Sequence, residues 1–462
     1  MKINTSIIFI LIAFLCKAEI PEKALSLEDV ISLANNSIDY QILQQQKLYL
    51  ERSEDEKFYH YFPKIMMSST LPEITNYHAL TDSSYTTKSI TAGVSITQNL
   101  FYNSVLTAGL YGSEVLEESS TSYKYLNLGL STELHYKMKF NKEYSSIKRS
   151  LEIKQLELES AIIDYQYLLV RKYYDLYRVI SEQEIEMKGY DLSLKHYNEG
   201  VSKFKAGIIP EVEMLDLELY LQKKELSLKR SKNTLSYFKE EFNRFIKYPN
   251  DYDIRLKYDN KEVIKHEIDF DDDIDKMYKN NPAFLNSRNE ILDKEDALSD
   301  VYRTKSIKGQ VSMSYFMDGS NNAYDLNFDN DNSKTVFSLG LSIPLFDGND
   351  LINSLDIAKL NLKISKEKLK DTQIELENLF RSKVRNLELN YENLEITKKS
   401  FDLSEKIYNI SQKRFENGLI TSKDFIQNQI DYISNKQDMI NSEIDYILSV
   451  YEYKKFIGIS LF

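Results

Sequence analysis

The region between Gly348 and Gly418 constrains the fold most, because it contains neither glycine nor proline. Within it, large apolar residues recur every seven positions, and the spacing resumes after one step of eleven. The members of this seam are Leu355, Leu362, Leu369, Leu376, Leu387, Leu394, Phe401, Tyr408 and Phe415. Repeats of seven favour helices that supercoil to the left. The pattern predicts one helix of about 70 residues, which would be about 100 Å long.

A second apolar seam runs along the same helix, two residues ahead of the first. Its members are Leu389, Ile396, Leu403 and Ile410. Two residues correspond to about 200° around a helix, so the two seams lie on nearly opposite flanks. A two-stranded coiled coil has only one seam. We therefore expect helices packed on both sides, as in the wall of a helical cylinder, and several copies of the chain assembled side by side.

The chain contains an internal duplication. The motif from Phe204 to Ile209 recurs 211 residues later, from Phe415 to Ile420, and the stretch 128–131 recurs at the same distance as 339–342. Two asparagine pairs, Asn35–Asn36 and Asn280–Asn281, are instead 245 residues apart, so the first half has about 34 extra residues before Gly129. Each half therefore predicts a short helix, a strand region, a long helix, a glycine turn and a returning helix.

Gly207 and Gly418 are predicted to form the tips of two helical hairpins. A residue with left-handed backbone conformation is needed where a helix ends and the chain reverses, and glycine adopts it most readily. Pro210 suits the first turn of the first returning helix.

Four segments alternate between apolar and polar residues, as strands with two unlike faces do. They lie at 90–96, 126–134, 311–315 and 336–343. Alternating segments of this length in an exported chain fit an outer-membrane β-barrel, whereas a soluble sandwich would have more strands at regular spacing. The signal from each segment is weak by itself.

The N-terminus resembles a secretory signal peptide, with an apolar run of nine residues from Ile7 to Leu15 and small residues before Glu19. Cleavage after Ala18 would leave no cysteine. Acylation of Cys16 is the alternative, although Leu15 is larger than lipoprotein signals prefer. The expected organisation is a signal peptide (1–18), a first repeat (19–247) with the insertion among its strands, an acidic linker (248–275) and a second repeat (276–462).

Charge and motifs indicate neither nucleic-acid binding nor catalysis. The net charge is −12, from 71 acidic and 59 basic residues. The five histidines are far apart in the sequence, and no nucleotide-binding, metalloprotease or serine-hydrolase motif occurs. We expect no enzyme activity, no cofactor and no metal site.

The order of several motifs resembles the TolC-like outer-membrane efflux proteins, also called outer membrane factors, over nearly the whole mature chain. The segment from Leu27 to Ile31 resembles the opening helix of that family, and Asn280-Asn281-Pro282 repeats the opening. The segment 344–348 (PLFDG) resembles its strand-to-helix signature. The resemblance implies a mainly α-helical homotrimer, in which each copy contributes four strands to a shared outer-membrane barrel and long helices to a periplasmic α-barrel tunnel. The roughly 34 extra residues would enlarge the extracellular side of the first strand hairpin or add a hairpin there.

The resemblance also implies partners and sites. A periplasmic adaptor protein would dock at the tips, and an inner-membrane pump would supply energy. The docking residues would be Gly207, Ile208, Gly418 and Leu419. The constriction or gate would comprise Glu213, Asp424, Phe204 and Phe415. Ile420 and Asn428 depart from the Arg and Asp of some members, which puts an arginine-based lock in doubt.

Each of these gate residues has a second interpretation. Glu213 and Asp424 lie six residues after the tip glycines, where acidic side chains also stabilise the first turn of a helix. Phe204 and Phe415 continue the apolar seams, so they could simply pack in the core.

The sequence therefore predicts an outer-membrane exit duct of a tripartite efflux pump or a type I secretion system, through which solutes pass passively. One alternative is a periplasmic adaptor, although adaptors usually have a single hairpin and glycine-rich β-domains. The other is an exported coiled-coil spacer without a pore, which the alternating segments disfavour.

Overall fold

The computed structural model describes residues 24–34, 37–53, 55–70, 73–78, 83–100, 104–115, 122–135, 142–247, 255–257, 263–305, 307–319, 333–343 and 345–462. The expected signal peptide, the pair Asn35–Asn36 and Pro344 lie outside these residues, as does part of the acidic linker. In the described part of the chain, no helix has both the length and the apolarity needed to cross a membrane.

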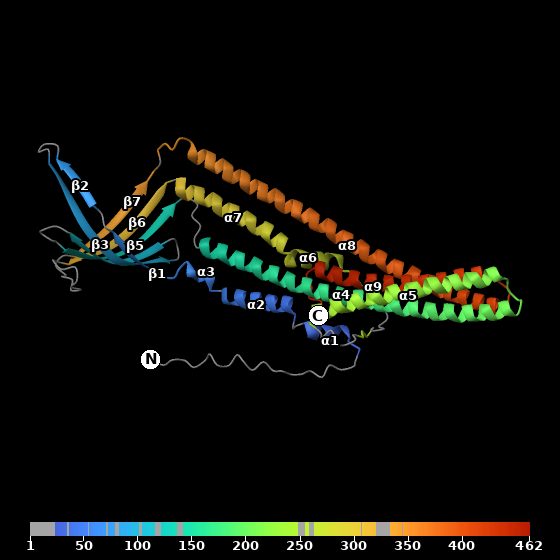
Figure 1. Cartoon of the computed structure of the whole chain (residues 1–462). Helices are drawn as coiled ribbons and strands as arrows, with labels where there is room; N and C mark the ends of the chain where they lie inside the picture. The colour runs from blue at the N-terminus through green and yellow to red at the C-terminus, as the bar shows by residue number, and fades with distance from the viewer. Residues whose placement is uncertain are drawn as a thin grey trace.

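Two long helical hairpins form most of the molecule (Figure 1). The first consists of α4 (Lys142–Lys205) and α5 (Glu211–Ile246), and the second of α8 (Asp350–Glu416) and α9 (Ser422–Phe456). Helices α4 and α8 have 64 and 67 residues, in agreement with the length expected from the seams. Contacts between α4 and α5, α4 and α9, and α8 and α9 order the four helices with α5 and α8 on the outside.

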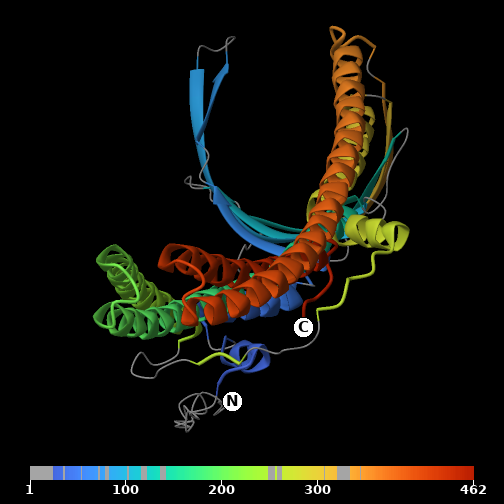
Figure 2. The same ribbon diagram turned by 90° about the vertical axis from the view of Figure 1, so that its right-hand side faces the viewer.

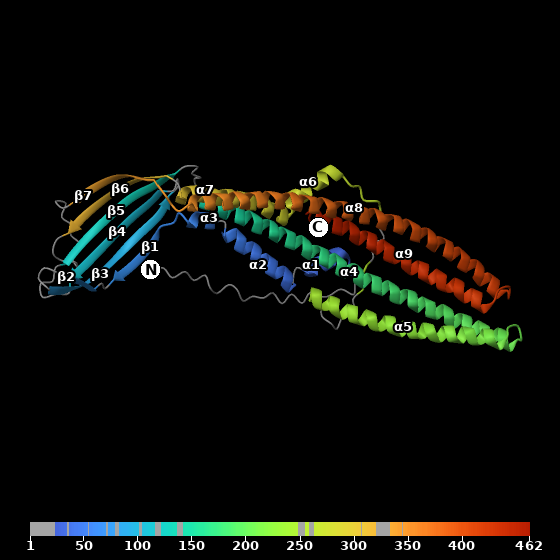
Figure 3. The ribbon, with the colours of Figure 1, turned by 90° about the horizontal axis from the view of Figure 1, so that it is seen from above.

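Shorter helices precede the strands in each half. The first half has α1 (Leu27–Ala34), α2 (Ile38–Ser53) and α3 (Glu56–Tyr59), and the second half has α6 (Phe270–Asn280) and α7 (Pro282–Lys305). Helix α2 packs on α4, α7 packs on both α4 and α8, and the row α2–α4–α7–α8 approaches the sheet (Figures 1 and 3). The end of the expected acidic linker (248–275) belongs to α6, which begins at Phe270. The carboxylate of Asp269 accepts a hydrogen bond from the backbone N of Asp272 and caps that helix.

All the strands that the structure describes join one antiparallel sheet at the end opposite the tips (Figure 3). They are β1 (Lys64–Thr70), β2 (Glu73–His78), β3 (Ser83–Leu100), β4 (Ser104–Val115), β5 (Ser122–His135), β6 (Lys308–Gly319) and β7 (Ser333–Ser342). The order is β1-β3-β4-β5-β6-β7, and β2 pairs with the far end of β3. The described path has six strands where the resemblance implies four, so of the two expected effects of the extra residues the structure shows an added hairpin.

The sheet curves strongly (Figure 2). Its two faces differ in the kind of residue that they carry. One cross-strand row on the first face runs Ile96, Ala108, Leu128 and Tyr315, and a neighbouring row includes Leu106, Leu130, Met313 and Phe337. Most of these apolar side chains are exposed, for example Leu130 at 47% and Phe337 at 65%. The rows on the other face carry mainly small or polar residues, such as Gly109, Asn127, Ser312 and Ser314, which are buried or half-buried.

Two buried clusters fix the middle of the helical part. In the first half, Tyr165, Leu169 and Phe242 pack with the α1 residues Val30 and Ala34. In the second half, Phe380, Leu394 and Tyr453 join α8 to α9 and to Met277 of α6. Inside the second cluster, the hydroxyl of Tyr453 donates a 2.6 Å hydrogen bond to Asp273, which is 7% exposed. Each repeat thus anchors its short leading helix against its own hairpin.

The bond between Tyr453 and Asp273 gives a test of this packing. Replacing Tyr453 with Phe leaves the buried carboxylate without its hydroxyl donor, so we expect a stability loss of about 1–3 kcal/mol. Tyr278→Phe is the matched control: its hydroxyl donates to Glu377 at 2.8 Å from a half-buried site, and its loss should cost less than about 1 kcal/mol. Denaturant midpoints of the purified protein in detergent would measure both. Equal effects would contradict the assigned burial.

Candidate functional site: the helical tips

The two tips have the same backbone geometry, as the duplication predicts. Gly207 and Gly418 have φ angles of 71° and 69°. The residue after each glycine donates its backbone N–H back to the helix, from Ile208 to the carbonyl of Lys203 at 2.9 Å and from Leu419 to that of Arg414 at 2.8 Å. Ile208 and Leu419 are 64% and 67% exposed, so each tip presents an apolar side chain to solvent.

Both acidic candidates lie in the first turn of a returning helix. Glu213 is in α5, and its carboxylate accepts a 3.4 Å hydrogen bond from the backbone N of Ser422 at the start of α9. Asp424 forms a reciprocal cap with Thr421: its backbone N donates to the Thr421 hydroxyl oxygen at 3.2 Å, and that hydroxyl lies 2.8 Å from the Asp424 carboxylate. The structure therefore brings both carboxylates to the N-terminus of α9, where the helix dipole favours negative charge.

The two gate phenylalanines differ in their surroundings. Phe415 is 2% exposed and stacks on Phe425, with ring centroids 4.7 Å apart and planes 9° apart. Phe204 is 38% exposed. Of the two interpretations, burial favours core packing for Phe415, because its ring faces the interior of its own protomer.

Lys203, which the sequence analysis did not single out, ties the two hairpins together beside this stack. Its ammonium donates a 2.7 Å hydrogen bond to the carbonyl of Phe415 and lies 4.3 Å from the centre of the Phe415 ring. Together with the bond from Ser422 to Glu213, it is one of two polar contacts between the hairpins close to the tip glycines. Further from the tips, Arg178 pairs with Asp445 and Lys455 pairs with Asp164. No sequence motif marks Lys203; only its place one residue before Phe204 suggested a position near the tip.

His196 is the other tip residue that sequence reasoning missed. It is 2% exposed, and its ring stands edge-on to Phe425 at 4.5 Å and to Phe415 at 6.3 Å. Within the described residues neither ring nitrogen makes a hydrogen bond, and Nδ1 lies 3.5 Å from Oε2 of Glu199. Burial lowers the pKa of His196, and Glu199 only partly opposes this effect. A neutral imidazole is therefore packed into the joint between the hairpins.

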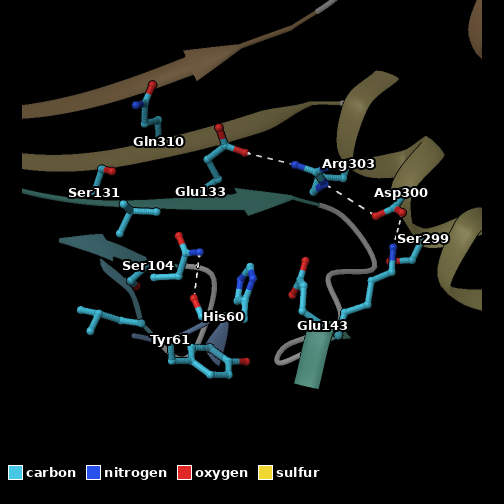
Figure 4. Close-up of a pocket in the computed structure, with 14 residues that line it drawn as sticks. His60, Tyr61, Ser104, Ser131, Glu133, Glu143, Ser299, Asp300, Arg303 and Gln310 are labelled. Atoms are coloured by element: carbon cyan, nitrogen blue, oxygen red, sulfur yellow. Dashed lines mark hydrogen bonds and ion pairs between the residues drawn. The ribbon is translucent and has the colours of Figure 1, made fainter. Parts of the chain in front are cut away.

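A polar pocket lies at the opposite end, where strands become helices (Figure 4). Its volume is about 360 Å³. Four charged lining residues pair with one another: Asp300 pairs with Lys142, and Arg303 lies 3.7 Å from Asp300 and 4.0 Å from Glu133. Asn99 donates to the carbonyl of His60 at 3.1 Å. These contacts join β3, β5, α3, α4 and α7. They therefore stabilise the junction between the sheet and the helices, called the neck below.

Comparison with known proteins shows which proteins this chain is similar to. Residues 307–451 match the profile of the outer membrane efflux protein family. This segment of the second half therefore resembles an outer membrane efflux protein domain. The expected resemblance to TolC-like efflux proteins is thereby confirmed. No curated protein sequence matches the chain significantly.

Solved structures share the fold over most of the chain. The CmeC outer membrane channel of Campylobacter jejuni is 14% identical, with a TM-score of 0.64, and the match covers 94% of this chain and 85% of that one. VceC of Vibrio cholerae is 12% identical, with a TM-score of 0.66 and coverage of 94% and 97%. The open state of MtrE from Neisseria gonorrhoeae is 8% identical, with a TM-score of 0.63 and coverage of 94% and 89%. The fold is therefore that of outer-membrane channels.

His196 makes the stability of the tips depend on pH. Because its pKa in the folded chain lies below the ordinary value of 6.5, the folded state binds fewer protons than the unfolded chain in mildly acidic solution. Its contribution is present above about pH 6.5 and is lost as the pH falls towards the folded pKa. Glu199 favours the protonated ring, as does Glu416 of α8, while Lys195 disfavours it.

We therefore expect the melting temperature to fall between pH 7.5 and 5.5, and His196→Phe to reduce that fall. Phenylalanine preserves an aromatic ring beside the stack of Phe415 and Phe425 but cannot titrate. The measurement is the difference in melting temperature between the two pH values, compared for the two proteins. An undiminished fall in the variant would show that protonation of His196 does not destabilise the joint.

Proposed function

We propose that this protein is the outer-membrane exit duct of a tripartite efflux pump or type I secretion system, built as a homotrimer and passing solutes without consuming energy itself. The observation that carries the proposal is the distribution of apolar residues in the sheet, which is the reverse of that in a water-soluble protein. Its exposed face is apolar, and its half-buried face is small and polar. Such a sheet suits lipid on the outside and water on the inside, as in outer-membrane barrels.

The helices support assembly from several copies. The second seam of α8 is unpartnered in the single chain, with Leu389, Ile396, Leu403 and Ile410 between 59% and 62% exposed. Helix α5, on the other flank, exposes a second apolar stripe that includes Val212, Leu215, Leu219 and Leu226, each at 49% or more. Because these stripes lie on opposite outer helices, α5 of one copy can cover α8 of the next, and the contacts close into a ring.

In this assembly the tips form the periplasmic end of the duct. The exposed Ile208 and Leu419 would dock an adaptor protein, which links the duct to an inner-membrane pump. Glu213 and Asp424 would bring six carboxylates from three copies to the constriction. Opening would separate the hairpins at the polar contacts of Lys203 and Glu213 near the tips, in an iris-like motion. The pump would supply the energy, since the duct itself only provides the passage.

The seam on α8 provides a test of the trimer. Ile396→Asp places a carboxylate in the apolar contact between copies, and burying an unpaired charge costs several kcal/mol, so we expect the trimer population to fall at least about tenfold. Asn409→Asp adds the same charge at an exposed position of the same helix that lies away from both seams, and it should leave the trimer intact. Light scattering in detergent measures the mass. A wild-type monomer, or equal behaviour of the two variants, would count against the proposal.

The carboxylates predict cation selectivity in planar bilayers. Glu213→Gln combined with Asp424→Asn removes their charge but keeps oxygens that can accept the hydrogen bonds at the start of α9. We expect the cation-to-anion permeability ratio to fall towards unity in the double variant, because a ring of negative charge concentrates cations. Glu225→Gln, which neutralises an exposed carboxylate further along α5, is the control. Anion selectivity, or an unchanged ratio in the double variant, would refute the constriction.

A further inference from the structure

We propose that each copy contributes six strands to the barrel wall, so that three copies close an 18-stranded barrel whose lumen is wider than the tunnel entrance and does not limit the size of the cargo. This inference rests on the trimeric duct proposed above. It differs from the four-strand contribution that the family resemblance implies, and it assigns a role to the insertion of about 34 residues in the first half.

The repeat identifies the extra strands. Gly129 of β5 corresponds to Gly340 of β7 at the spacing of 211 residues. The start of β6 at Lys308 follows the start of β1 at Lys64 by 244 residues, within one residue of the 245 spacing. Strands β3 and β4 have no counterparts among the described strands of the second half, so the insertion accounts for them. An insertion of two strands preserves the alternating directions of its neighbours.

The residues of the extra hairpin are patterned as barrel wall. On the apolar face Val94 pairs with Leu110, which pairs with Leu126 of β5. On the polar face Ser95 pairs with Gly109, which pairs with Asn127. Both faces of the sheet therefore continue through β3 and β4 without a change of polarity. A hairpin that folded over the mouth of the barrel would not need an apolar face matched to the strands beside it.

The free edges define the partner as a second copy of this chain. Within the described strands, β1 pairs only with β3 and β7 only with β6, and almost every residue of both edge strands is exposed. Strand β1 leaves the helical end and β7 returns to it, so β7 of one copy lies antiparallel to β1 of the next. Unpaired strand edges are not tolerated in lipid, and the trimer provides the pairing that closes them.

The strand number sets the width. With strands about 4.8 Å apart and tilted by about 40°, 18 strands close a barrel about 36 Å across, whereas 12 strands give about 24 Å. Barrels of 16–18 strands hold an aqueous channel. Since the inner face carries mainly small residues, side chains take up little of this width. The narrowest part of the duct is then at the tips, and the class of solute is selected there or by the pump.

Thiol cross-linking tests which strands adjoin, in a Cys16→Ser background that leaves no other cysteine. Ser68→Cys on β1 combined with Val336→Cys or Ser338→Cys on β7 probes the edge between copies, with a short bifunctional thiol reagent. We expect covalent dimers and trimers in denaturing gels. Thr107→Cys on β4 with the same β7 positions is the matched control and should give none. Thr107 lies on the same face of the sheet as these β7 positions. It is in one cross-strand row with Val336, because the register runs from Thr107 through β5 and β6 to Val336.

A second pair tests whether the insertion lies within the wall. Met66 and Ser95 are directly paired across β1 and β3, so cysteines at both positions should cross-link within one chain. Cross-linking of β4 to β7 between copies, or failure of the Met66–Ser95 pair, would show a four-strand wall and overturn the inference. A protein that is monomeric in detergent would instead refute the trimer itself.

Access from the extracellular side gives an independent measure. Polyethylene glycols of graded size, added to that side only, reduce single-channel conductance when they enter the barrel. We expect polymers too large for a mouth about 24 Å across to enter this one. Exclusion of all such polymers would overturn the inference even in an intact trimer.

Discussion

The seam of Leu389, Ile396, Leu403 and Ile410 runs along α8 with each side chain about 60% exposed, although the helix is buried along its other seam. The same imbalance occurs in the sheet, where Leu339 and Leu341 of β7 are 74% and 70% exposed. At about 25 cal/mol per Å², leaving this much apolar surface in water is costly. The fold of the single chain therefore leaves apolar surface of α8 and of the sheet exposed. In the proposed assembly, lipid and other copies cover this surface.

Within one copy, the contacts that hold the structure are unevenly distributed. The clusters around Tyr165 and Phe380 bind each short leading helix to its hairpin through many buried side chains. The cluster at the tips is smaller, and it includes His196, whose ring nitrogens make no hydrogen bond in the described part of the chain. Lys203 and Glu213 each add one polar tie between hairpins. The end that must open in a duct is thus joined by fewer and more easily altered contacts than the middle.

The long helices, the tip glycines and the duplication could be predicted from the sequence because each leaves a periodic or repeated pattern. Strand β4 was not recognised, since Gly109 and Gly112 interrupt its alternation of large residues. His196 and Lys203 gave no local signal, because their roles arise where α4 meets Phe415 and Phe425, more than 200 positions away in the chain. The expected acidic linker (248–275) illustrates a partial success: helix α6 begins inside it at Phe270, and Asp269 caps that helix.

The neck shows why six strands suit this helical framework. Near the sheet each copy presents the row α2–α4–α7–α8, and helices packed about 8–10 Å apart span about 32–40 Å in four columns. Six strands at about 4.8 Å spacing and about 40° tilt span about 38 Å, whereas four span about 25 Å. A six-strand wall therefore continues the helical wall at nearly equal width. The ion pairs of Lys142, Asp300, Arg303 and Glu133 then join two layers that already match. A four-strand wall would instead have to taper there.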